Sequence, residues 1–123
     1  MSTTKKILIV EDDPQLQEIY QTIFSQEGFH TIPVTDGKQG LFMVKSQKPD
    51  LVLLDLMLPG GMNGFDVLEE IKRNEETKNI PVIIMTNLDS EAKMAKKIGC
   101  DYYFIKSNVQ IEEIIKVIKK MLA

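Results

Sequence analysis

The chain has 123 residues, of which 43% are hydrophobic and 27% charged, and its formal net charge is −3. This composition suits one globular domain with its own core, and without a cluster of Lys and Arg it gives no reason to expect a nucleic-acid partner. A single cysteine, Cys100, excludes an internal disulfide and favours a reducing, cytoplasmic compartment. No apolar run approaches the ~18 residues of a membrane span, and the first residues lack the apolar region of a secretion signal, so we expect no membrane association.

The first half of the chain predicts two strands and two helices. Residues 7–10 are a short apolar run typical of a strand, and Asp13 before Pro14 is typical of a helix cap followed by the first helical residue. Residues 30–34 form a weaker strand, which Pro33 places at an edge of the sheet because proline cannot donate to a ladder. Asp36 then opens a second helix, which runs to about residue 46.

One apolar run ends in a carboxylate. Residues 51–54 show no polar alternation, which is typical of a strand buried on both faces. An isolated ionised Asp inside such a run would be very costly, so Asp55 is expected where the strand emerges at its carboxyl end. Ligands bind at that edge in open α/β sheets. A turn over residues 59–61 then leads to a helix that Asn63 caps.

The remaining elements continue the alternation. Residues 80–85 are predicted to form another buried strand that ends at Thr86. Ser90 or Asp89 is expected to cap the helix after it. A last short strand covers residues 102–105, and an isoleucine-rich amphipathic helix follows it.

Five predicted strands alternating with five helices indicate an α/β fold, a three-layer, doubly wound, five-stranded parallel sheet. No linker or low-complexity stretch divides the sequence, so we expect residues 1–123 to form a single domain. The carboxyl ends of parallel strands share one edge, so the polar residues that follow the strands are expected to meet there. They are Glu11, Asp12, Asp55, Thr86 and Lys106.

These residue types indicate phosphoryl-transfer chemistry. Three neighbouring carboxylates repel one another unless a cation joins them, and hard oxygen ligands in small number suit Mg²⁺. An Asp carboxylate is already ionised at neutral pH and needs no general base to act as a nucleophile. Lys106 and Thr86 offer a positive charge and a hydroxyl donor for phosphoryl oxygens. His30, the only histidine, is expected to be partly exposed and is not placed to act as an internal donor.

The sequence resembles the receiver domain of two-component response regulators over essentially its whole length. The resemblance rests on residues 7–14, residues 55–60, Thr86 and residues 103–106. It implies a flavodoxin-like sheet with strand order 2-1-3-4-5. It also implies a phosphorylation-dependent switch, not a conventional enzyme, with some self-dephosphorylation. A sensor histidine kinase or a histidine phosphotransfer protein would supply the phosphoryl group.

The resemblance also assigns roles to individual residues. Asp55 would accept the phosphoryl group, and Mg²⁺ would be held by Glu11, Asp12, Asp55 and the backbone carbonyl of Met57. Thr86 and Lys106 would bind the phosphoryl oxygens, and Tyr103 would be the switch aromatic that turns inward as Thr86 moves. The face formed by the fourth helix, the fifth strand and the fifth helix would meet an unknown downstream protein. Without an output domain, the signal is expected to leave by protein–protein contact.

The sequence departs from the family pattern at three positions. Ser107 follows Lys106 where the family usually has a cis proline, and a cis bond before a non-proline residue costs about 2.5–4 kcal/mol, so we predict a trans bond. Asn87 follows Thr86 where a small residue is typical, and we predict that it narrows access to Asp55 and alters dephosphorylation. Gly61 makes the turn after Asp55 one residue longer, which should make this loop more mobile.

Three other functions compete with this interpretation. An aspartyl-phosphate phosphatase of the haloacid-dehalogenase type expects a second Asp two residues after the nucleophile, where this chain has Met57. A flavin- or nucleotide-binding domain needs a Gly-rich or Ser/Thr-rich loop after the first strand, where this chain has Glu11, Asp12 and Asp13. A receiver-like scaffold that is never phosphorylated is disfavoured by the presence of Asp55, Thr86 and Lys106, whereas Ser107 in place of the family's proline leaves it open.

Overall fold

The computed structural model describes residues 4–123, which form one five-stranded parallel sheet with five helices. The strand order is β2-β1-β3-β4-β5, which confirms the predicted doubly wound, flavodoxin-like α/β fold. The strands are β1 (Lys6–Val10), β2 (His30–Val34), β3 (Leu51–Leu54), β4 (Val82–Thr86) and β5 (Tyr102–Ile105). The helices are α1 (Pro14–Gln26), α2 (Gly37–Gln47), α3 (Gly64–Arg73), α4 (Ala92–Ile98) and α5 (Ile111–Met121).

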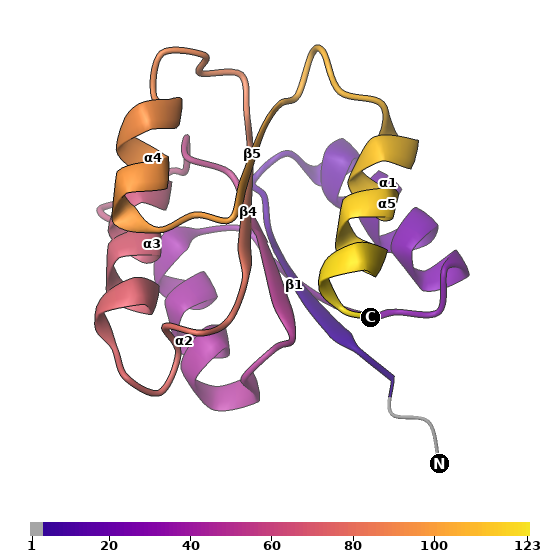
Figure 1. Ribbon diagram of the computed structural model, residues 1–123, viewed down its shortest axis with the longest axis horizontal. Helices are drawn as coiled ribbons and strands as arrows, with labels where there is room; N and C mark the ends of the chain where they lie inside the picture. The colour runs from indigo at the N-terminus through magenta and orange to yellow at the C-terminus, as the bar shows by residue number, and fades with distance from the viewer. Residues whose placement is uncertain (1–3) are drawn as a thin grey trace.

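The helices cover both faces of the sheet and make three layers. Helices α2, α3 and α4 lie on one face, and α1 and α5 lie on the other (Figure 1). Successive residues of β1 serve opposite faces: Leu8 packs into the core under α2 and α3, whereas Ile9 packs into the core under α1 and α5. The two cores explain why residues 51–54 show no polar alternation, since every residue of β3 is buried.

The outer strand β2 has the features expected of an edge. It pairs only with β1 among the described strands, and Pro33 lies opposite Ile9 without disturbing a second ladder. His30 is exposed at its first residue, as predicted. Cys100 is 9% exposed and packs in the core beneath α3 and α4.

Two helices, α1 and α3, begin at the predicted caps, and α2 begins where the sequence predicted a helix to open. Asp13 accepts the backbone N–H groups of Gln15 and Leu16, with Pro14 as the first residue of α1. Asp36 accepts an N–H of α2 in the same way, and Asn63 forms a reciprocal capping box at the start of α3.

The cap of α4 was predicted wrongly. Helix α4 begins at Ala92 with Glu91 as its N-cap, and neither Ser90 nor Asp89 caps it. Glu91 has φ −104° and ψ 3°, whereas a side-chain cap requires extended backbone at that position. The Ser90 hydroxyl instead donates to the Glu91 carboxylate at 3.4 Å.

Within residues 4–123 no helix has the length and apolar character needed to cross a membrane.

Candidate functional site

Polar residues from four strands meet at the carboxyl edge of the sheet. Glu11 follows β1 and Asp55 follows β3, and the paired register of these strands, with Val10 opposite Leu54, brings the two acids side by side. Backbone bonds continue past the strand ends, because the N–H of Asp55 donates to the carbonyl of Val10 at 3.1 Å. Thr86 is the last residue of β4, and Lys106 follows β5.

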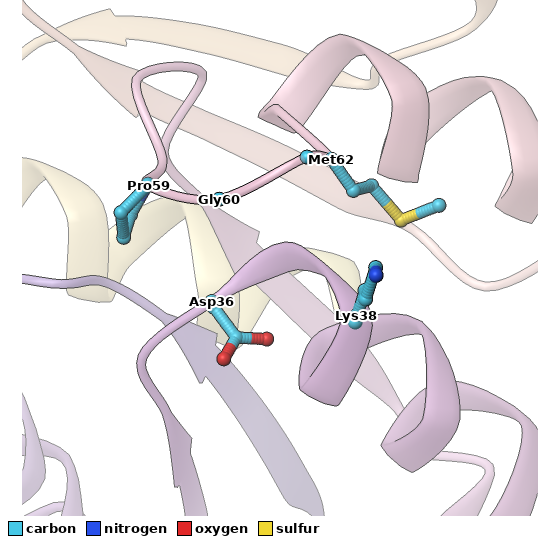
Figure 2. A pocket seen from close by; sticks show the side chains of 6 residues that line it. Asp36, Lys38, Pro59, Gly60 and Met62 are labelled. Atoms are coloured by element: carbon cyan, nitrogen blue, oxygen red, sulfur yellow. The ribbon is translucent and has the colours of Figure 1, made fainter.

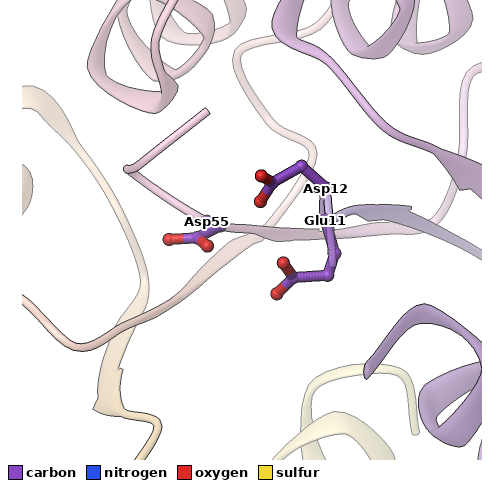
Figure 3. Close-up of side chains that lie close together, drawn as sticks. All are labelled: Glu11, Asp12 and Asp55. Atoms are coloured by element: carbon purple, nitrogen blue, oxygen red, sulfur yellow. The ribbon is translucent and has the colours of Figure 1, made fainter. Parts of the chain in front are cut away.

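Three carboxylates gather at this edge. Glu11, Asp12 and Asp55 each offer an oxygen within 4.8 Å of the others, and Figure 3 shows the three side chains converging from the ends of β1 and β3. Glu11 and Asp55 are 2% and 5% exposed, whereas Asp12 reaches solvent. Three carboxylate oxygens at one partly open position form a donor set that suits a hard divalent cation such as Mg²⁺.

Lys106 bridges the two buried acids. Its Nζ lies 2.6 Å from Oε1 of Glu11 and 2.7 Å from Oδ2 of Asp55. Burial lowers the pKa of Lys106, but its hydrogen bonds to Asp55 and Glu11 together outweigh burial and leave that pKa above its ordinary value. Burial also raises the pKa of Glu11, against the opposing effects of Lys106 and the N–H of Asp13. The ammonium therefore compensates the charge of the Glu11 carboxylate, which burial disfavours, and it also bonds Asp55.

The Asp55 carboxylate is held by two donors of different kinds. Oδ2 accepts from Lys106, and Oδ1 accepts the backbone N–H of Met57 at 3.1 Å. These bonds orient the carboxylate at the mouth of the site. Met57 is 57% exposed, and it meets the site through its backbone N–H.

Thr86 and Tyr103 meet through the loop between β4 and α4. Thr86 is fully buried, and its Oγ1 accepts the N–H of Leu88 at 3.3 Å. The half-buried Tyr103 donates its hydroxyl hydrogen to the carbonyl of the same Leu88. The hydroxyl of Tyr103 is thus fixed to the loop that leaves Thr86.

A buried glutamine supports the end of β1 and the Glu11 that follows it, and sequence reasoning missed this residue. Gln17 is 6% exposed, and its amide nitrogen lies 3.0 Å from the carbonyl of Ile9, 3.2 Å from that of Glu11 and 2.9 Å from that of Val34. It ties α1 to the ends of β1 and β2 directly under Glu11. Its spacing from Tyr20, which places both on the buried face of α1, was the available signal.

The three departures from the family pattern lie around this site. No peptide bond in residues 4–123 is cis, so the Lys106–Ser107 bond is trans, as predicted. Asn87 is exposed, and its Oδ1 accepts the N–H of Ser107 at 3.1 Å, a contact that the sequence did not predict. The longer turn, including Gly61, borders a pocket of about 250 Å³ beside Asp36 and Lys38 at the start of α2 (Figure 2).

Comparison with known proteins gives consistent matches. A family model described as the response regulator receiver domain matches residues 7–119. Sporulation initiation phosphotransferase F of Bacillus subtilis is 39% identical over 121 residues, covering 96% of this chain and 94% of that protein. The receiver domain of the sensor histidine kinase PA1611 from Pseudomonas aeruginosa, solved with a magnesium ion coordinated in the active site cleft, matches at TM-score 0.86 and 25% identity. That match covers 97% of this chain and 98% of that one.

Another relative is much longer than this chain. The DNA-binding response regulator MtrA of Mycolicibacterium smegmatis is 39% identical over 104 residues, which are 83% of this chain and 44% of MtrA. The match to this chain therefore spans less than half the length of that relative.

Proposed function

This chain belongs to the response regulator receiver domain family, and from that premise we propose that Asp55 is its phosphoacceptor. Receiver domains in two-component systems take phosphoryl groups from histidine kinases or phosphotransfer proteins. The observation that carries the proposal is the environment of Asp55: a buried carboxylate at a sheet edge, oriented by Met57 N–H and Lys106, beside two further acids. The four residues Glu11, Asp12, Thr86 and Lys106 would assist it.

The proposed step is an in-line transfer from a phosphohistidine. A carboxylate oxygen of Asp55 forms a bond to phosphorus as the phosphorus–nitrogen bond breaks, and the departing imidazole keeps the electron pair and takes a proton from solvent. The Lys106 ammonium exchanges its contact with Asp55 for an oxygen of the transferred group. Thr86 ends β4, the strand beside the one that precedes Asp55. Its hydroxyl would donate to another oxygen of the phosphoryl group.

Receiver domains generally bind Mg²⁺, and the residues present here fit that ion. Glu11, Asp12, Asp55 and the backbone carbonyl of Met57 would hold it. When bound, the ion would supply positive charge that offsets both the clustered carboxylates and the charge on the transferred phosphoryl group. Lys106 supplies positive charge to both Glu11 and Asp55.

The signal would leave the site through Tyr103. Its hydroxyl is bound to Leu88, so a movement of Thr86 and its loop toward a phosphoryl group would alter the environment of this ring. Tyr103 lies on β5 and packs against the core under α2, α3 and α4. The face formed by α4, β5 and α5 is the proposed contact for a downstream protein. We assign residues 1–123 to a single receiver unit that acts as a switch with some self-dephosphorylation and is not a conventional enzyme.

The proposal is tested by phosphorylation with acetyl phosphate and Mg²⁺, followed by intact-mass measurement. The wild type is expected to gain the mass of one phosphoryl group, and Asp55→Asn none. Asp13→Asn is the matched control. Asp13 follows Glu11 and Asp12 in the chain but caps α1, and asparagine caps equally well. A wild type that gains no phosphoryl group from acetyl phosphate or from a phosphohistidine donor would show that the chain is an unphosphorylated scaffold.

A further inference from the structure

The loops that follow Thr86 and Lys106 are joined through the residues immediately after these two. Asn87 follows Thr86, and its side-chain Oδ1 accepts the backbone N–H of Ser107, the residue after Lys106, at 3.1 Å. The strand ends themselves are also joined, because the N–H of Lys106 donates to the carbonyl of Thr86 at 2.9 Å. We call the side-chain bond from Asn87 to Ser107 the loop clasp.

The loop clasp requires both of the unusual residues at these positions. Proline at position 107, which the family pattern favours, has no N–H to donate. A small residue such as alanine at position 87 has no side-chain oxygen to accept. The two departures from the pattern therefore supply the donor and the acceptor of one hydrogen bond, and neither would form it alone.

The loop clasp completes a set of ties on the loop between β4 and α4. Both backbone polar groups of Leu88 are bonded: its N–H donates to Thr86 Oγ1, and its carbonyl accepts from Tyr103. The only tie among these bonds that reaches beyond Lys106 into the loop before α5 is the one from Asn87 to Ser107. It sets the distance between the two loops next to the residues that would bind the phosphoryl group.

We infer that Asn87 is a positioning residue, which holds the Thr86 and Lys106 loops together through Ser107 and so aligns their hydroxyl and ammonium groups before a phosphoryl group arrives. This inference rests on the function proposed above. Pre-aligned donors lower the barrier both for transfer to Asp55 and for hydrolysis of the phosphorylated form, because the same charge develops in both. The loop clasp therefore speeds both steps.

A positioning role for Asn87 predicts the opposite change in the phosphorylation rate from the hypothesis that Asn87 merely narrows access to Asp55. A smaller side chain would open the site under that hypothesis, and Asn87→Ala would accelerate phosphorylation. Under the present inference Asn87→Ala slows phosphoryl uptake and self-dephosphorylation by about two- to fivefold, the change that corresponds to the loss of one exposed hydrogen bond.

The experiment measures both rates in the full chain with acetyl phosphate and Mg²⁺ for Asn87→Ala, Ser107→Pro, their combination and Ser107→Ala. Ser107→Pro is expected to be at least as slow as Asn87→Ala, because it removes the donor and also permits a cis bond at this position. Ser107→Ala keeps the N–H and should stay near the wild-type rates. The double variant should be no slower than the slower of the two single variants, since both remove the same bond.

Several outcomes would overturn the inference. The first is faster phosphoryl uptake and self-dephosphorylation in Asn87→Ala than in the wild type. The second is a double variant whose rates fall by the product of the two single effects. The third is a Ser107→Ala protein whose rates are as low as those of Ser107→Pro. Amide exchange of Ser107 in the unphosphorylated protein separates this inference from the proposed function, because it needs no phosphoryl transfer. The amide should exchange faster in Asn87→Ala, and an unchanged rate would refute the loop clasp itself, whereas a wild type without phosphoryl uptake would refute the proposed function.

Discussion

Gly64, the first residue of α3, lies against the backbone of the strand end that carries Asp55. A Cβ at this position would be 2.2 Å from the carbonyl oxygen of Asp55 and 2.4 Å from Cα of Leu56. Both are backbone atoms, so the clash cannot be relieved by a side-chain rotation. The absence of a side chain at position 64 is thus what lets α3 begin directly beside the strand end that carries Asp55.

Gly64→Ala is therefore expected to lower the free energy of unfolding by about 3 kcal/mol, the upper end for an overpacked site. Urea denaturation measures the change. Gly61→Ala is the matched control in the preceding turn, where a Cβ meets nothing within 4 Å, and it should change stability little. Equal losses in the two variants would show that the close approach at Gly64 does not determine stability.

Single residues at the strand ends could be predicted from the sequence, but their mutual contacts could not. The end of an apolar run identifies Asp55 and Lys106 as residues at one sheet edge, because parallel strands point the same way. A lysine side chain is long enough to reach several acids, so its bonds to both Glu11 and Asp55 depend on the final backbone. The same limit applies to Asn87, whose partner lies 20 positions away in the sequence.

At the scale of elements, local signals predicted the helix starts where the backbone before the helix is extended. Asn63 has ψ 178° and forms both bonds of a capping box with Asp66. Glu91, before α4, has ψ 3°, so no side chain at that start makes a cap bond. A sequence shows which residues are able to cap but not the backbone angle that the preceding loop imposes. This is why α4 alone was misjudged among the three helices for which a cap was predicted.

Removal of the α3 cap should be measurable. Asn63→Ala leaves the N–H of Asp66 without its acceptor and should lower the free energy of unfolding by about 1 kcal/mol. Asn63→Ser keeps a capping oxygen and should retain most of the stability. Thermal or urea unfolding distinguishes the two, and the prediction fails if alanine and serine destabilise α3 to the same extent.

At the scale of the whole molecule, hydrophobic patterns indicated the layers but not the neighbours within the sheet. Apolar runs without alternation, such as residues 51–54, require helices on both faces, and the structure has them in two cores. The order β2-β1-β3-β4-β5 followed from family resemblance, because periodicity does not identify which strands pair. Only Pro33 gave a local indication, since it restricted β2 to an edge.

The balance of charge at the sheet edge leads to a prediction for the whole fold. Glu11, Asp12 and Asp55 carry three negative charges, and Lys106 bonds two of these acids with one positive charge. An ion that binds these acids in the folded chain and not in the unfolded one stabilises the fold by mass action. At one hundred times its dissociation constant, Mg²⁺ would add about 2.7 kcal/mol to the free energy of unfolding.

Thermal unfolding in Mg²⁺ and in EDTA at equal ionic strength measures this stabilisation. The matched ionic strength removes the general screening of surface charge, which would otherwise imitate binding. Asp12→Asn should lose most of the Mg²⁺-dependent shift, because it removes one of the three carboxylates. Asp13→Asn should keep it, since Asp13 caps α1 and lies outside the proposed ligand set. An equal shift in Asp12→Asn and the wild type would place the bound ion elsewhere on the molecule and remove Mg²⁺ from the proposed site.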